Sequence, residues 1–148
     1  MTTQYSQLLF LCTGNYYRSR FAEHLFNYHA QDYQLPWRAF SRGLALEMLD
    51  EDAGPISLNT LEALSARGIP LDGEIRSPLA LAEQDLTIAN HIIALKQAEH
   101  HPLMTRKFPD WTERVEYWHV HDIDYASPEE ALPQIEQAVR ELIDRLAI

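Results

Sequence analysis

Cys12-Thr13-Gly14-Asn15-Tyr16-Tyr17-Arg18-Ser19 is the stretch that decides the fold of this chain. An apolar run at residues 8–11 precedes it, and an amphipathic stretch at residues 20–31 follows it. That order predicts a strand, a tight loop and a helix. The amides of such a loop converge on a bound oxyanion, and the N-terminus of the helix adds positive potential. The sequence therefore predicts an anion cradle.

A cysteine and an arginine bracket the loop, which gives the cradle its chemistry. The positive field favours the thiolate of Cys12, the form that attacks electrophiles. Arg18 can bind two oxygens of a phosphoryl group through its planar fork. The alternative is a buried free cysteine beside an ordinary arginine at a helix start. Gly14, Asn15 and Ser19 favour the cradle, because these residue types suit a tight phosphate loop.

The motif resembles the signature of the low-molecular-weight protein tyrosine phosphatases, Cys-x-Gly-Asn-x-x-Arg-Ser. The similarity extends over nearly the whole chain, including Ser41-x-Gly43 and the acidic segment after Trp118. The resemblance implies a cysteine-dependent phosphomonoesterase that forms a phosphocysteine intermediate, with Cys12 as nucleophile and Arg18 as phosphate ligand. Related arsenate reductases share the fold and the loop, so the motif alone leaves the reaction open.

Composition and charge limit the class of protein. A chain of 148 residues predicts one domain, residues 1–148, and 46% hydrophobic content suits a globular core. The N-terminus lacks a signal-like segment, and no apolar run is long enough to cross a membrane. Cys12 is the only cysteine, which fits a reducing compartment, so we expect a cytoplasmic protein. The net charge of −10 argues against nucleic acid as a partner.

Strand and helix patterns alternate along the chain. This alternation predicts an α/β fold, and the resemblance implies a flavodoxin-like, open parallel four-stranded sheet with helices on both faces. Because parallel strands end at one edge, we expect Cys12, Ser41, Lys96 and residues 120–124 to converge there. The expected strands are residues 7–12, 37–41, 91–95 and 114–120, and the expected helices are 19–31, 56–66, 78–84, 97–107 and 127–146.

A phosphatase of this kind needs an acid that protonates the leaving oxygen. The resembling family supplies it from an Asp-Pro on the loop after the fourth strand. Here the segment reads His121-Asp122-Ile123-Asp124-Tyr125, without the proline. Counting from Trp118 and from the helix start at Ser127, Asp122 matches the family aspartate best, and Asp124 stays open. The alternative is that both aspartates are solvated loop residues.

Three residues are expected to support the loop. The resemblance implies that Ser19 donates a hydrogen bond to the Cys12 thiolate and that Ser41 is the partner of Asn15. Asn15 itself is expected in an unusual, left-handed backbone conformation, which asparagine tolerates. An ordinary helix cap for Ser19 and an ordinary strand-end serine for Ser41 are the alternatives.

Two tyrosines are unusual inside such a loop. We expect one of them to line the rim of the pocket and the other to pack beneath the loop. Arg20 stands where the family has proline, and we expect it on a solvated helix face. The expected phosphate-binding set is Thr13, Gly14, Asn15, Tyr16, Tyr17, Arg18 and Ser19.

Substrate preference is the least determined feature. Phosphotyrosine-acting relatives carry an aromatic wall residue in the loop that corresponds to residues 44–55. Here that loop has no aromatic residue, and Glu47 lies near the position of the wall residue. Tyr125, from the loop that carries the acid, can supply a ring. We expect a phosphorylated protein or small aryl phosphate as substrate and inorganic phosphate as product. No cofactor or metal is expected, because zinc needs three convergent ligands and the only cysteine is committed. The rival functions are an arsenate reductase that uses an external thiol and a non-catalytic phosphate-binding module.

Overall fold

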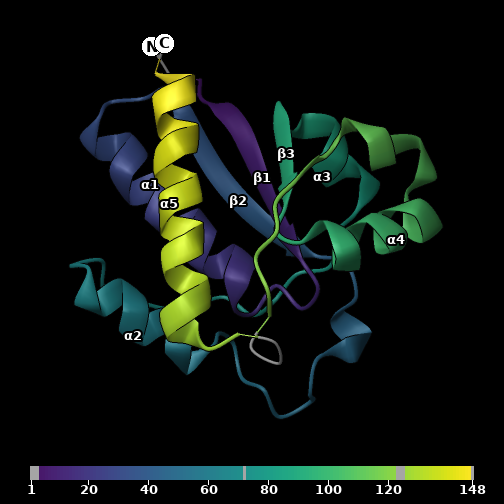
Figure 1. The fold of residues 1–148 in the computed structure, drawn as a ribbon, viewed down its shortest axis with the longest axis horizontal. Coiled ribbons are helices and arrows are strands. Elements are labelled where there is room, and N and C mark those ends of the chain that lie inside the picture. The colour runs from purple at the N-terminus through teal and green to yellow at the C-terminus, as the bar shows by residue number, and fades with distance from the viewer. Residues whose placement is uncertain (1–3, 72, 123–125, 148) are drawn as a thin grey trace.

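A computed structural model of the chain describes residues 4–71, 73–122 and 126–147. The described residues form a parallel four-stranded sheet with the strand order β2-β1-β3-β4 (Figure 1). The expected α/β fold with an open parallel sheet is therefore confirmed. The strands are β1 (Ser6–Cys12), β2 (Trp37–Gly43), β3 (His91–Ala94) and β4 (Glu116–Tyr117).

Helices cover both faces of the sheet because β1 is apolar on both sides. Leu8 and Phe10 belong to a core shared with α1 (Arg18–Asp32) and α5 (Pro128–Leu146). Leu9 and Leu11 point the other way, into a second core under α3 and α4. Figure 1 shows these two helix layers on either side of the strands. The remaining bounds are α2 (Leu58–Ala66), which packs beside α1, and α3 (Glu83–Ile88), α4 (Gln97–Lys107), η1 (Leu46–Met48) and η2 (Pro109–Arg114).

The short third helix begins later than the sequence predicted. A helix was expected at residues 78–84, but α3 covers Glu83–Ile88. The preceding residues are extended because Gly43 bonds to them on both sides, donating to the Leu79 carbonyl at 2.8 Å and accepting from the Leu81 amide at 2.9 Å. Asp85 then caps the start of α3 by accepting a hydrogen bond from the Ala82 amide.

The fourth strand is also shorter than predicted. Residues 114–120 were expected to be extended, but Arg114 ends the 3₁₀ helix η2 and β4 covers Glu116–Tyr117. The chain beyond β4 still bonds to the exit of β3: the amides of Trp118 and Val120 donate to Ala94 and Leu95 at 2.8 Å. Residue 120 is thus held at the edge of the sheet where β1 ends.

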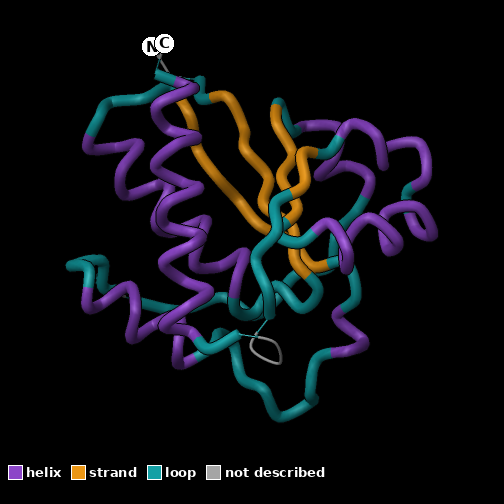
Figure 2. Tube along the Cα trace, viewed as in Figure 1, coloured by secondary structure: helices purple, strands orange, loops and turns teal. Residues whose placement is uncertain are grey.

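The C-terminal ends of the strands lead into loops on one side of the molecule, where Figure 2 shows the longest non-helical connections. Segments that are distant in sequence meet at this edge, as the parallel order requires. No helix in the described part of the chain is both long and apolar enough to cross a membrane.

Candidate active site

A cavity of about 390 Å³ lies at the C-terminal end of β1. Its walls include the phosphate loop, which we define as residues 12–19, together with residues from the loop before α2. Cys12, Arg18 and Asp122 contribute to the lining, so the expected nucleophile, phosphate ligand and acid share one cavity. Apolar contributions come from Leu49 and Leu58.

Cys12 forms a hydrogen bond with Ser19, the second residue of α1. Its Sγ lies 2.9 Å from Oγ of Ser19, and both side chains are buried. Ser19 Oγ already accepts a hydrogen bond from Nδ2 of Asn15 at 2.9 Å. A thiolate has no hydrogen to donate, so toward the thiolate form of Cys12 the Ser19 hydroxyl is the donor. This is the contact that the sequence analysis expected.

Asn15 fixes the shape of the phosphate loop. Its φ is 51°, so the left-handed conformation expected for it is confirmed. Its Nδ2 donates to Ser19 and Ser41, and its Oδ1 accepts from Arg76 Nη1 at 2.9 Å and the Leu79 amide at 3.1 Å. Every hydrogen-bonding position of the carboxamide is thus occupied. The buried Asn15 side chain ties the loop to β2 and to the segment before α3.

Gly43 leaves the space that the phosphate loop needs. A Cβ at this position would lie 2.9 Å from the Thr13 carbonyl oxygen and 3.1 Å from Asn15 Cβ. A side chain there would push the loop away from β2. This close approach explains the glycine of the Ser41-x-Gly43 segment.

Arg18 is 1% exposed and is held by groups from two other segments. Nη1 and Nη2 lie 3.2 and 3.1 Å from the two carboxylate oxygens of Glu99. Nη1 also donates to the Val120 carbonyl at 3.0 Å, and Nη2 lies 3.5 Å from Oδ2 of Asp122. Burial opposes the charge of Arg18, but Cys12 and Glu99 outweigh it and raise the pKa of the guanidinium.

Glu99 and its neighbour His100 are the residues of the site that the sequence analysis missed. They lie in the first turn of α4, directly after β3. Burial opposes ionisation of Glu99, yet its hydrogen bonds to Arg18 and Thr13 hold its pKa below the ordinary value. A signal was present: a helix that follows a strand in a parallel sheet begins at the ligand edge, so its first turn faces the site.

The expectation for Arg20 was wrong. Its side chain is 1% exposed, not on a solvated face. It donates to the carbonyls of Asn15, Pro55 and Arg76 at 3.3, 3.0 and 2.9 Å. Burial and the nearby Arg76 lower its pKa to about 10. The guanidinium takes the place of water as the hydrogen-bond donor for three loop carbonyls. The helical periodicity of the sequence does not predict these hydrogen bonds.

The two tyrosines of the phosphate loop both line the cavity and differ in burial. Tyr16 is half-buried, and its hydroxyl donates to the Ala53 carbonyl. Tyr17 is buried in the core shared by α1 and α5. Its hydroxyl has no hydrogen-bond partner among the described residues. Burial, followed by the charge of Asp122, raises the pKa of Tyr17 to about 12.

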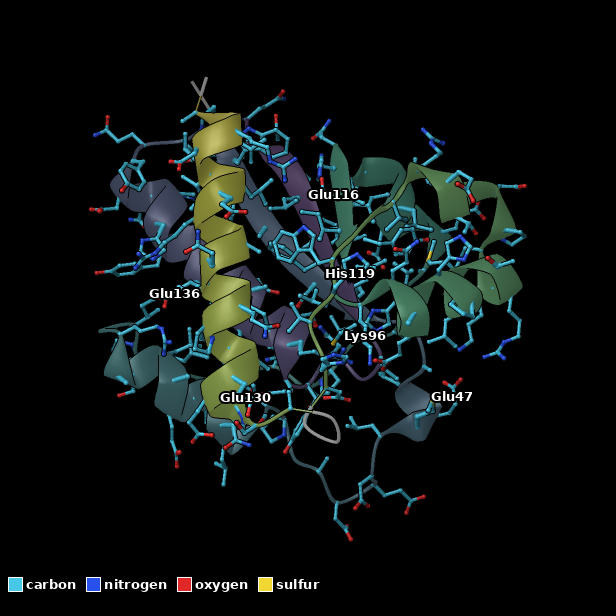
Figure 3. The ribbon with its side chains drawn as sticks, in the orientation of Figure 1. Glu47, Lys96, Glu116, His119, Glu130 and Glu136 are labelled. Carbon is cyan, nitrogen blue, oxygen red and sulfur yellow. The ribbon has the colours of Figure 1, made fainter. Side chains whose placement is uncertain are left out.

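Asp124, the alternative acid, and Tyr125, the expected aromatic ring, lie outside the described residues. Glu47 is exposed on η1, where Figure 3 labels it, and its carboxylate lies 2.7 Å from Nζ of Lys107. The hydrogen bond from Lys107 lowers the pKa of Glu47. Leu49, not Glu47, supplies the wall of the cavity from this loop among the described residues.

No group of three metal-binding side chains occurs in the part of the chain that the structure describes. His119, labelled in Figure 3 with Lys96, pairs through its backbone with Lys96 at the exit of the sheet. His100 is fully buried. Its Nε2 forms a hydrogen bond with the Thr13 hydroxyl of the phosphate loop at 3.1 Å.

Comparisons with known proteins agree with this geometry. A family model described as low molecular weight phosphotyrosine protein phosphatase matches residues 7–147. The low molecular weight protein tyrosine phosphatase from T. tengcongensis superposes with a TM-score of 0.79 at 24% identity, over 95% of this chain and 99% of its own. YfkJ from Bacillus subtilis gives 0.81 at 25%, over 97% and 96%. The YwlE arginine phosphatase from Geobacillus stearothermophilus gives 0.74 at 21%, over 96% and 93%. No curated protein matches the chain.

Proposed function

Because the chain belongs to the low molecular weight phosphotyrosine protein phosphatase family, we propose that Cys12 is the nucleophile of its reaction. The family makes the chain a cysteine-dependent phosphatase, with a phosphorylated substrate and inorganic phosphate as product. The observation that carries the assignment is the contact of 2.9 Å between Cys12 Sγ and Ser19 Oγ, at a cavity that Arg18 also lines. Nucleophile, anion ligand and leaving-group stabiliser then occupy one cradle.

In the first step the Cys12 thiolate attacks phosphorus in line with the leaving oxygen. The S–P bond forms as the P–O bond breaks. Arg18 and the amides of the phosphate loop bind the equatorial oxygens, which carry the charge of the transition state. Asp122 donates its proton to the leaving oxygen, so the alcohol departs neutral.

In the second step Asp122 takes a proton from water. The water oxygen attacks phosphorus, the S–P bond breaks, and inorganic phosphate forms. The Ser19 hydroxyl donates a hydrogen bond to the sulfur, and this bond stabilises the departing thiolate. The same carboxyl group thus serves as acid and then as base, and the proton balance closes over the two steps.

An aryl phosphate is the proposed substrate, either on a protein tyrosine or as a small molecule. Support comes from the apolar part of the lining, where Tyr16, Leu49 and Leu58 can pack against a ring. The arginine phosphatase of similar fold makes phosphoarginine the second substrate to test. We place the enzyme in the cytoplasm, because the reaction needs the lone Cys12 in its reduced form.

The test is steady-state hydrolysis of an aryl phosphate by the wild type and by Cys12→Ser, Arg18→Lys and Arg140→Lys. We expect no turnover by Cys12→Ser and a loss of orders of magnitude in Arg18→Lys, since lysine lacks the planar fork. Arg140 is 63% exposed and serves as the matched control. Vanadate and phosphate should inhibit competitively. Turnover by a folded Cys12→Ser protein would overturn the assignment.

The same assay separates the rival functions. Phosphate release that continues without added thiol rules out a reductase that depends on an external thiol. Tight vanadate binding with no turnover on any substrate would indicate a phosphate-binding module. Phosphotyrosine peptides, phosphoarginine and small aryl phosphates, compared at equal concentration, assign the leaving group.

A further inference from the structure

The first turn of α4 reaches both ends of the phosphate loop. The carboxylate of Glu99 accepts a hydrogen bond from the Thr13 hydroxyl at the start of the loop. It also pairs with Arg18 at the end of the loop, through both carboxylate oxygens. One acidic side chain from outside the signature motif therefore holds the second and the seventh residues of that loop.

The hydrogen bonds of Arg18 leave one edge of the guanidinium for a ligand. A guanidinium has five N–H groups. Glu99 occupies the edge formed by Nη1 and Nη2, and the Val120 carbonyl takes the second hydrogen of Nη1. Nε and the second hydrogen of Nη2 lie on the same side, and Oδ2 of Asp122 is 3.5 Å from Nη2. This edge, formed by Nε and Nη2, has the geometry to bind two phosphoryl oxygens.

His100 fixes the direction of the hydrogen bonds behind Glu99. Its Nδ1 accepts from the Lys96 backbone amide at 3.0 Å and so carries no hydrogen. In the neutral ring the hydrogen must be on Nε2, which lies 3.1 Å from the Thr13 hydroxyl oxygen. That oxygen therefore accepts from His100, and its own hydrogen points to Glu99. A directed chain of donors runs from the Lys96 amide through His100 and Thr13 to Glu99, and the Glu99 carboxylate also accepts from Arg18.

We propose that Glu99 and His100 are positioning residues that preset Arg18 for the phosphoryl group. Glu99 holds the edge of the guanidinium that Nη1 and Nη2 form. The edge that Nε and Nη2 form is thereby turned toward the substrate before it binds. His100 keeps the Thr13 hydroxyl oriented toward Glu99, so the carboxylate stays in place. The inference rests on the proposed function, because it assigns a role toward the arginine that binds phosphate. A fork set in advance costs no reorganisation when the substrate arrives.

The test compares Glu99→Gln with Glu113→Gln. Both exchange a carboxylate for an amide, and Glu113 is 91% exposed, so it is the matched control. A glutamine amide cannot accept both guanidinium bonds, so Arg18 loses its fixed orientation. We expect kcat/KM for an aryl phosphate to fall by about 10²-fold in Glu99→Gln, the scale of a small misplacement of a catalytic group. Competitive inhibition by inorganic phosphate should weaken in the same variant and stay unchanged in Glu113→Gln.

Two further comparisons keep the proposal testable if Glu99→Gln folds poorly. Thr13→Ser retains the hydroxyl and should keep most of the activity, whereas Thr13→Val should show the loss expected for Glu99→Gln. His100→Leu should also lower kcat/KM, and its effect should not add to that of Glu99→Gln, since the two residues act through one chain. A purely structural role would lower the melting temperature and leave kcat/KM unchanged below it.

The outcomes separate this inference from the proposed function. Unchanged kcat/KM and unchanged phosphate inhibition in a folded Glu99→Gln protein would overturn the positioning role. Equal activity of Thr13→Ser and Thr13→Val would do the same for the directed chain. In either case the loss of turnover in Cys12→Ser would still stand. If Cys12→Ser is active, the proposed function fails, whatever Glu99 does.

Discussion

The carboxamide of Asn15 donates a hydrogen bond of 2.9 Å to the Ser41 hydroxyl, which lies 26 residues away in the sequence. The contact joins the phosphate loop to the end of β2. It is one of four hydrogen bonds that this buried carboxamide makes. These bonds hold a backbone conformation, φ 51°, that a residue with a side chain rarely adopts. The loop is thus shaped by its partners as much as by its own sequence.

The first prediction separates the backbone from the hydrogen bonds of Asn15. Asn15→Gly relaxes the left-handed backbone and deletes all four bonds. We expect the free energy of unfolding to fall by about 2–4 kcal/mol, at ~1 kcal/mol per bond. Urea unfolding measures this loss, and competitive inhibition by phosphate should weaken in parallel.

Gln34 provides the matched control for that change. It has φ 56° and an exposed side chain. Gln34→Gly should therefore leave stability equal or raise it by up to about 1 kcal/mol, since only backbone strain is relieved. If Asn15→Gly is as harmless as Gln34→Gly, the carboxamide does not hold the loop.

The second prediction assigns the general acid. Asp122→Asn should lower kcat by ~10²–10⁴-fold for aryl phosphates with poor leaving groups, because those need protonation most. The loss should be smaller for good leaving groups, whose oxygens depart as anions. A plot of rate against leaving-group pKa measures this for Asp122→Asn and Asp124→Asn. A steeper dependence in Asp124→Asn alone would move the acid by two residues.

The third prediction concerns acid stability. Burial, followed by the charge of Arg18, lowers the pKa of His100 from 6.5 to about 3. Between these values the unfolded chain binds a proton that the folded protein does not, so stability falls as pH falls below 6.5. The slope from this group is at most ~1.4 kcal/mol per pH unit. Urea unfolding at pH 7, 6 and 5 should show a flatter dependence in His100→Gln than in the wild type.

The control for that slope is His119→Gln, because His119 is exposed. Its pH dependence should match the wild type. Burial also lowers the pKa of His24, so its contribution has the same sign and cancels in the comparison. Equal slopes for His100→Gln and the wild type would show that the His100 ring titrates normally in the folded protein.

The fourth prediction uses two tyrosines whose hydroxyls have different surroundings. The Tyr17 hydroxyl has no partner among the described residues, whereas that of Tyr117 donates to the Thr112 carbonyl at 2.8 Å. Tyr17→Phe should raise the free energy of unfolding by about 1 kcal/mol, because an unpaired buried donor is removed. Tyr117→Phe should lower it by a similar amount. A loss in both variants would show that the Tyr17 hydroxyl is paired in solution.

The sequence predicted the parts of the structure that local pattern controls. Alternating strands and helices give the parallel sheet, and the spacing from Cys12 to Arg18 gives the loop. Asn15 in the left-handed region follows from residue type and place. These features need only neighbours in sequence, or the rule that parallel strands end at one edge.

The partners of the loop could not be predicted in the same way. Arg20 is buried because loop carbonyls of Asn15, Pro55 and Arg76 surround it. Glu99 reaches Arg18 across 81 residues of sequence. Such pairings depend on the three-dimensional placement of polar groups, which leaves no periodic signal. The late start of α3 has the same origin, in the backbone bonds to Gly43.

The last prediction concerns the acidic residues beside the cavity. Asp50, Glu51 and Asp52 are exposed on the loop that Tyr16 anchors through Ala53. Glu47 pairs with Lys107, which offsets its negative charge. We therefore expect a double variant, Asp50→Asn with Asp52→Asn, to improve kcat/KM for acidic phosphotyrosine peptides more than Glu47→Gln does.

The physical reason is charge repulsion at the mouth of the cavity, which steers acidic peptides away before they bind. The gain in the double variant should be largest at low salt, because ions screen exposed charges within about 10 Å at 0.1 M. A small aryl phosphate is the control, since it carries no flanking carboxylates and should be hydrolysed at the same rate by all three proteins. Efficient hydrolysis of acidic peptides by the wild type, with no dependence on salt, would show that Asp50 and Asp52 do not guard the cavity.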